Sequence, residues 1–137
     1  MAIKMENGKY FFIGATAATG SEVFISDGTP SGTKLLKEIV AGELGSQPMD
    51  FFALNDWVYF TAETEAEGRE LWRTNGTPEG TTMVKDINPG ASDSNNGGEY
   101  NLSALGNVLI FSATGNDSGM ELWKSDGTAL GTVMVKD

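Results

Sequence analysis

The sequence predicts an all-β protein built from three four-stranded antiparallel units, arranged as blades of a β-propeller. Three observations predict this class: one motif recurs three times, turn residues divide each copy into four strands, and the strands are apolar at consecutive positions. The motif reads EVFISDGTPSGTKLLKE at 22–38, ELWRTNGTPEGTTMVKD at 70–86 and ELWKSDGTALGTVMVKD at 121–137. Its second and third copies agree at 11 of 17 positions, far above chance. Such self-similarity at a fixed period is the signature of a repeat architecture.

Each copy contains four short strands. The first strands are predicted at Ile3–Met5, Phe51–Leu54 and Tyr100–Leu105, and the second strands at Lys9–Ile13, Trp57–Thr61 and Val108–Ser112. The third and fourth strands lie within the three motif copies. Tight turns such as Asn7-Gly8 separate the first strand from the second. Polar stretches at 41–48 and 89–99 join the copies, so the chain divides into blades at about 1–47, 48–98 and 99–137, all in one module.

The apolar pattern of the strands favours a propeller. A sheet with one face in water alternates polar and apolar residues. The second strands do not alternate: Tyr10 to Ile13, Trp57 to Phe60 and Val108 to Phe111 are apolar throughout. Sheets stacked face to face about an axis bury both faces and allow such runs. The alternative is a β-trefoil, which also has three repeats of four strands.

The motif copies resemble the ELWxxDGT repeat family, which forms tandem arrays in large, often secreted bacterial proteins. The second and third copies match the pattern closely, and the segment 86–90, DINPG, matches the family's ending. The first copy departs from it, with Val23-Phe24 in place of Leu-Trp. The resemblance implies a propeller-like repeat array and an extracellular setting. It implies no particular chemistry. The N-terminus carries no apolar segment of a signal peptide.

Three blades do not close a ring, because propellers use about four to eight. Two apolar blade faces would then be left in water, and exposed faces of that extent mark association surfaces. The simplest closed solution is a two-fold homodimer with six blades. The expected partner of the chain is therefore a second copy of itself.

Composition narrows the other partners. The net charge is −10, and most of it lies in the middle unit, so the surface repels nucleic acid and anionic membranes. There is no cysteine and no histidine, which removes disulfides and catalytic groups that need either residue. We therefore expect no enzyme activity and no cofactor.

The loops that begin at Asp27, Asn75 and Asp126 are the sharpest motif. Glycine permits a positive φ there, and the Asp or Asn side chain can bond its own backbone two residues on. These features predict a structural hairpin loop. A calcium site at the same three residues is the weaker interpretation, because each loop offers one carboxylate at most and calcium takes six to eight oxygens.

Acidic residues also crowd the loops expected at the opposite end of the blades. These candidate ligand-binding residues are Glu63, Glu65, Glu67, Asp93, Asn116 and Asp117. Clustered acids favour a cation or a basic partner, although solvated loop tips have the same composition.

The function that the sequence favours is a non-enzymatic propeller module for binding or assembly. One alternative is a lectin-like carbohydrate-binding protein, with Trp72 or Trp123 stacking on sugars, although their apolar neighbours favour core packing. Another is an engineered or excised propeller fragment with no activity beyond folding and assembly.

Overall fold

The computed structural model describes residues 2–95, 100–115 and 118–136. They form three four-stranded antiparallel sheets, each built from consecutive strands. The first sheet contains β1 (Ala2–Lys4), β2 (Tyr10–Thr16), β3 (Gly20–Ser26) and β4 (Lys34–Lys37). The second contains β5 (Met49–Leu54), β6 (Trp57–Thr64), β7 (Gly68–Thr74) and β8 (Thr82–Lys85). The third contains β9 (Ser103–Leu105), β10 (Val108–Thr114), β11 (Met120–Ser125) and β12 (Val133–Lys136). All twelve predicted strands are present.

The three sheets repeat one register. Phe12 pairs with Phe24, Phe60 with Trp72, and Phe111 with Trp123. Each third strand also shifts register against its fourth strand at the same place, for example between Leu71 and Trp72. A β-bulge of this kind increases the local twist of a sheet. The sequence repeat is therefore a repeat of geometry.

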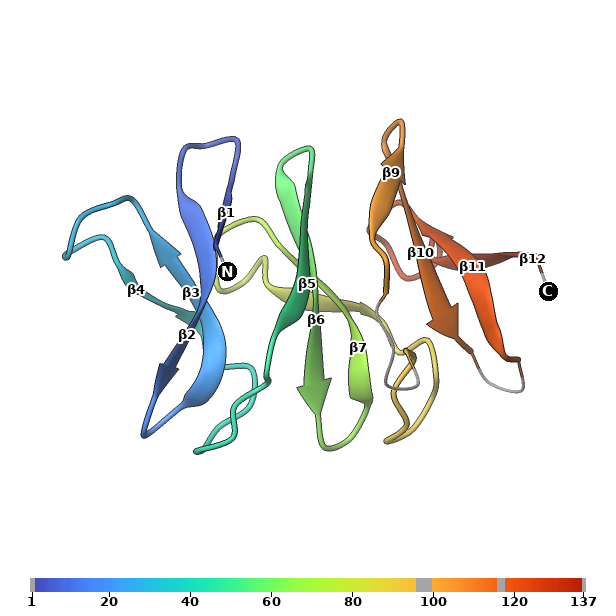
Figure 1. Ribbon diagram of the computed structural model, residues 1–137, viewed down its shortest axis with the longest axis horizontal. Coiled ribbons are helices and arrows are strands. Elements are labelled where there is room, and N and C mark those ends of the chain that lie inside the picture. The colour runs from blue at the N-terminus through green and yellow to red at the C-terminus, as the bar shows by residue number, and fades with distance from the viewer. Residues whose placement is uncertain (1, 96–99, 116–117, 137) are drawn as a thin grey trace.

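The sheets stand side by side along the long axis of the molecule, with β1, β5 and β9 in chain order and with β4 and β12 at opposite ends (Figure 1). Among the described strands, none pairs with a strand of another copy. The β-trefoil alternative does not fit this topology, because three separate sheets take the place of a shared barrel. The sheets form an open row, and the described chain does not close into a ring.

The middle sheet is buried on both faces. Val58, Tyr59 and Phe60 are consecutive, and all three are buried although their side chains point to opposite sides. The expectation of two dry faces is thus confirmed for this sheet. Each end sheet instead has one covered face and one open face.

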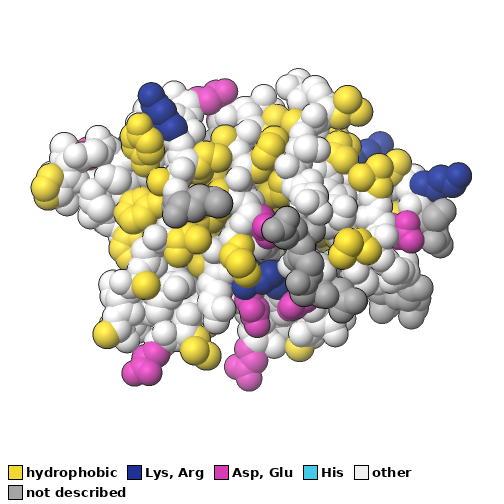
Figure 2. Space-filling model, in the orientation of Figure 1, with side chains coloured by type: hydrophobic (Ala, Val, Ile, Leu, Met, Phe, Trp, Pro, Cys, Tyr) yellow, Lys and Arg dark blue, Asp and Glu magenta, His cyan; other side chains and the backbone are white. Residues whose placement is uncertain are grey.

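The connections fall at two edges of the row. The β2–β3 and β6–β7 connections lie at the same edge as the inter-sheet segments near residues 41–47 and 88–94, which is the lower edge in Figure 1. Acidic side chains are visible along this edge (Figure 2). The sequence prediction that these loops share one side of the molecule is confirmed.

Candidate assembly interface

Two internal junctions show how one sheet packs on the next. At the first, Phe11, Val23 and Ile25 from the first sheet pack against Val58 and Phe60 from the second. The rings of Phe11 and Phe60 lie 5.4 Å apart. All five side chains are buried. Burial of large apolar side chains from both sheets makes this a core and not a surface contact.

The second junction uses the same positions one repeat later. Tyr59 and Leu71, the equivalents of Phe11 and Val23, pack against Leu109, Phe111 and Trp123 of the third sheet. At both junctions the same face of a sheet meets the following sheet, and the opposite face of that following sheet meets the preceding one. We call them the forward face and the rear face.

The end sheets present the same two faces without a neighbour. Tyr10 on the rear face of the first sheet is 43% exposed, whereas its equivalents Val58 and Leu109 are 1% and 0% exposed. On the forward face of the third sheet, Leu122 is 48% exposed, whereas its equivalent Leu71 is fully buried. Figure 2 shows hydrophobic side chains gathered over the first sheet. These open faces are unmatched halves of a junction that the chain already contains twice.

A polar contact accompanies each internal junction. The Lys37 ammonium donates to the Thr81 carbonyl oxygen at 2.9 Å, and the Lys85 ammonium donates to the Thr132 carbonyl oxygen at 2.9 Å. In both cases a lysine at the end of a fourth strand reaches the loop between the third and fourth strands of the following sheet. The contact adds directional specificity to an otherwise apolar interface.

A buried glutamate holds each inter-sheet segment. The Glu22 carboxylate accepts hydrogen bonds from the backbone N–H of Val40 (2.8 Å) and Ser46 (3.1 Å) and from the Ser46 hydroxyl (2.6 Å). Its equivalent Glu70 accepts from the N–H of Ile87 at 2.9 Å. The sequence interpretation of these recurring acids as architectural agrees with this geometry.

The environment of Glu70 is dry enough to change its ionisation. Burial raises the pKa of Glu70 to about 8, because desolvation disfavours the carboxylate. The backbone N–H groups of Ile87 and Asn88 act in the opposite direction and lower it. A pKa of about 8 favours the protonated form of Glu70 at neutral pH.

The three loops that begin at Asp27, Asn75 and Asp126, which we call the DGT loops, share one structure. Asp27 Oδ1 accepts from the Thr29 N–H and hydroxyl at 2.9 and 2.6 Å, and the Thr33 hydroxyl donates to the Thr29 carbonyl at 2.6 Å. A Cβ on Gly32 would lie 1.9 Å from Asp27 Oδ1, which explains the second glycine of the motif. The Thr29 hydroxyl and N–H lower the pKa of Asp27.

Asn75 and Asp126 close their own loops in the same way as Asp27. One oxygen of each predicted calcium ligand is thus used within its loop, as the structural interpretation requires. Within the described residues, no group of three or more Asp, Glu, His or Cys side chains is placed to hold a metal ion. Calcium binding stays a prediction.

The predicted acidic ligand residues are not brought to one point. The Glu63 carboxylate forms an ion pair with the buried Arg69 guanidinium at 3.3 Å, and the Glu67 carboxylate accepts from the Thr64 hydroxyl. Asp93 Oδ1 accepts from the Arg69 N–H at 2.7 Å. Asn116 and Asp117 lie outside the described residues. Three of these acids therefore have structural partners.

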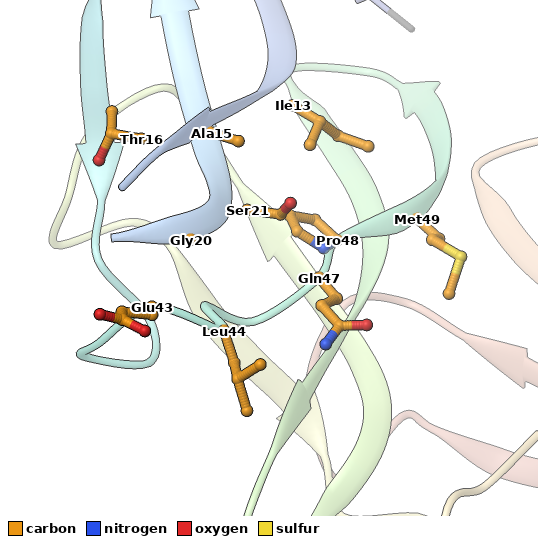
Figure 3. Close-up of a pocket in the computed structure, with 10 residues that line it drawn as sticks. All are labelled: Ile13, Ala15, Thr16, Gly20, Ser21, Glu43, Leu44, Gln47, Pro48 and Met49. Carbon is orange, nitrogen blue, oxygen red and sulfur yellow. The ribbon is translucent and has the colours of Figure 1, made fainter. Parts of the chain in front are cut away.

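Glu65 lines a cavity of about 670 Å³ together with Glu43 and Glu63. A second cavity of about 460 Å³ lies between the end of β2 and the starts of β3 and β5 (Figure 3). Glu43 and Gln47 line both cavities. In Figure 3 their side chains point in different directions and do not converge on a shared centre.

The tryptophans predicted to be core residues are core residues. Trp123 belongs to the second junction, and Trp72 packs against the first. Trp57 is partly exposed and carries the Arg73 guanidinium 3.7 Å from its ring centroid. The aromatic residues expected of a lectin site are thus used in sheet packing.

Among the described residues there is no helix long and apolar enough to cross a membrane.

Comparison with protein-family models, with curated proteins and with solved structures finds no match for this chain. The resemblance to the ELWxxDGT repeat family therefore depends on the motif copies themselves and stays a prediction.

Sequence reasoning missed the lysine contacts and the Arg69 cluster. A signal for the lysines was present, since Lys37, Lys85 and Lys136 occupy one position of the repeat. Arg69 had no such signal, because its equivalents are Ser21 and Met120. Its burial depends on the Gln47 carbonyl, the Thr61 hydroxyl and Glu63, which only the fold brings together.

Proposed function

We propose that this chain is a non-enzymatic β-propeller module for binding and assembly, and that a second copy completes its ring. The observation that carries the proposal is the contrast between equivalent positions. Positions that are buried at the two internal junctions are exposed at the two ends, and Leu71 and Leu122 differ in this way although both are leucine. The family resemblance supports the same architecture.

The two open faces are complementary by construction. The forward face of the third sheet is the repeat of the face that meets a following sheet, and the rear face of the first sheet is the repeat of the face that meets a preceding one. Two copies related by a two-fold axis bring each forward face onto the other copy's rear face. The product has six blades. It also has two identical junctions between the copies, which we call seams. Three copies would give nine blades, which exceeds the usual range of four to eight.

Solution mass tests the proposal. We expect sedimentation equilibrium to give twice the chain mass of 14.5 kDa. The variant Leu122→Asp places a charge on the forward face, and it should shift the protein to the monomer, since an unpaired charge is costly in a dry interface. A matched control is Leu130→Asp, at a loop tip that is 95% exposed, which should leave the mass unchanged. A wild-type protein that remains a 14.5 kDa monomer at micromolar concentration contradicts the proposal.

A further inference from the structure

The lysine contact is made at both internal junctions, and the two end sheets carry the same donor and acceptor without this contact. Lys136 is the equivalent of Lys37 and Lys85, it ends β12, and it is exposed. Thr33 is the equivalent of Thr81 and Thr132. Both of those threonines are fully buried under the preceding sheet, whereas Thr33 is exposed.

A second, independent feature marks the same loop of the first sheet as uncovered. A Cβ on Gly76 would lie 3.3 Å from the Ile25 side chain of the preceding sheet, and one on Gly127 would lie 2.1 Å from the Arg73 guanidinium. At the equivalent Gly28 nothing lies within 4 Å. The loop therefore has the shape that receives a preceding sheet, and no described sheet covers it.

We propose that the Lys136 ammonium of one copy donates a hydrogen bond to the Thr33 carbonyl of the second copy, and that this contact fixes the direction and register of the seam. The proposal rests on the ring described above and adds its partner atoms. It also gives the seam a polarity: the end of β12 meets the loop at residues 27–33, and it does not meet another β12.

Polarity matters because two exposed apolar faces can associate in more than one way. The two forward faces, which carry Leu122 and Val135, could also pack against each other, and that arrangement leaves the lysines without carbonyl acceptors. Burying an ammonium group without a hydrogen-bond partner is unfavourable, so the lysine disfavours this pairing. Apolar area supplies the attraction, and Lys136 selects the partner face.

Site-directed cross-linking tests the contact directly, because the natural chain contains no cysteine. One preparation carries Lys136→Cys and another carries Ser31→Cys, within the loop that ends at Thr33. A short bis-maleimide should join the two chains only when the preparations are mixed. A double variant, Lys37→Cys with Glu79→Cys, calibrates the length that the cross-linker can span. These two residues occupy the equivalent positions at the first internal junction, within one chain. The calibration pair should cross-link without forming a dimer.

The dissociation constant of the dimer gives a second readout. Lys136→Met keeps most of the apolar stem and removes the charge, and it should raise the dissociation constant at least about tenfold, because a charge-assisted hydrogen bond is lost at each of two seams. Glu65→Met is the control, at an exposed charge in the β6–β7 turn of the middle sheet, which belongs to neither open face, and it should leave the constant within about twofold.

The outcomes separate the two proposals. Cross-linking in the mixture, with calibration intact and weakened association of Lys136→Met, supports the seam contact. A dimeric wild type with no cross-link, or with Lys136→Met no weaker than Glu65→Met, overturns the contact while the ring stands. Cross-linking of Lys136→Cys with itself overturns the polarity of the seam and with it the six-bladed ring. A monomeric wild type overturns the ring itself.

Discussion

The middle sheet and the two end sheets have nearly the same sequence pattern and different surroundings. In the middle sheet, Val58, Tyr59 and Phe60 are all buried, because a neighbour covers each face. In the first sheet, Phe11 is fully buried while the adjacent Tyr10 is exposed. Leu71 of the middle sheet is fully buried, whereas Leu122, the same residue type at the equivalent position of the third sheet, is 48% exposed, so residue type does not decide burial at this position. The presence of a neighbouring sheet decides it, and the repeat prepares every sheet for two neighbours.

The difference between a covered and an open face can be tested most directly at the equivalent residues Leu71 and Leu122. Leu71→Ala should destabilise the chain by about 2–5 kcal/mol, because it leaves a cavity in the dry second junction. Leu122→Ala, at the equivalent position of the open face, should cost under about 1 kcal/mol at protein concentrations where the chain is monomeric. Chemical denaturation of both variants measures the difference.

The same two variants should respond differently to protein concentration. If the open face is an assembly surface, the loss of stability in Leu122→Ala should grow as the concentration rises, since association stabilises the folded state by mass action. The loss in Leu71→Ala should stay nearly constant. Equal losses in the two variants at every concentration would show that the end sheet is already as well packed as the middle one.

The buried glutamates offer a smaller contrast. Glu70→Ala should destabilise the chain by about 1–3 kcal/mol, because the backbone N–H of Ile87 loses its acceptor in a buried position. Glu121 is the equivalent residue in the third sheet and is only partly buried, so Glu121→Ala should cost no more than about 0.5 kcal/mol. Thermal melts of the two variants test this, and a Glu121→Ala loss as large as that of Glu70→Ala would refute the distinction.

A pH dependence is expected from a single group, Glu70. Folding raises the pKa of Glu70 from 4.5 to about 8, so between these values the folded state holds a proton that the unfolded state has released. The free energy of unfolding therefore falls as pH rises from about 4.5 to about 8 and levels off above that, with a slope of at most about 1.4 kcal/mol per pH unit.

The chain contains no histidine, so the range from pH 5.5 to 8 has few other groups that titrate. Urea unfolding across this range should show the decline in the wild type and a nearly flat profile in Glu70→Gln, which stays neutral. An unchanged slope in Glu70→Gln would assign the dependence to another group.

Much of this architecture was available from residue pattern. The recurrence of Glu70, Trp72 and Gly76 with their equivalents predicted three units, and the consecutive apolar residues of Trp57 to Phe60 predicted sheets with two dry faces. The DGT loops were predicted as structural turns, and their hydrogen bonds are internal. These features are local or periodic, so they are written in short stretches of chain.

The candidate interface was harder to predict in detail. The sequence indicated that three units leave faces uncovered, but not that Lys37 would meet a carbonyl 44 residues away or that Arg69 would be buried against Glu63. Such contacts depend on which loop of one sheet faces which strand of the next. The spacing of residues along the chain does not show which loop and strand lie next to each other in space.

The sequence by itself determined the strands, their number and the burial that each face seeks, because strand alternation and turn chemistry act over a few residues. Tertiary structure alone decided which faces found a neighbour. Packing is a property of surfaces in space, so the same residue type is core at Leu71 and surface at the equivalent Leu122.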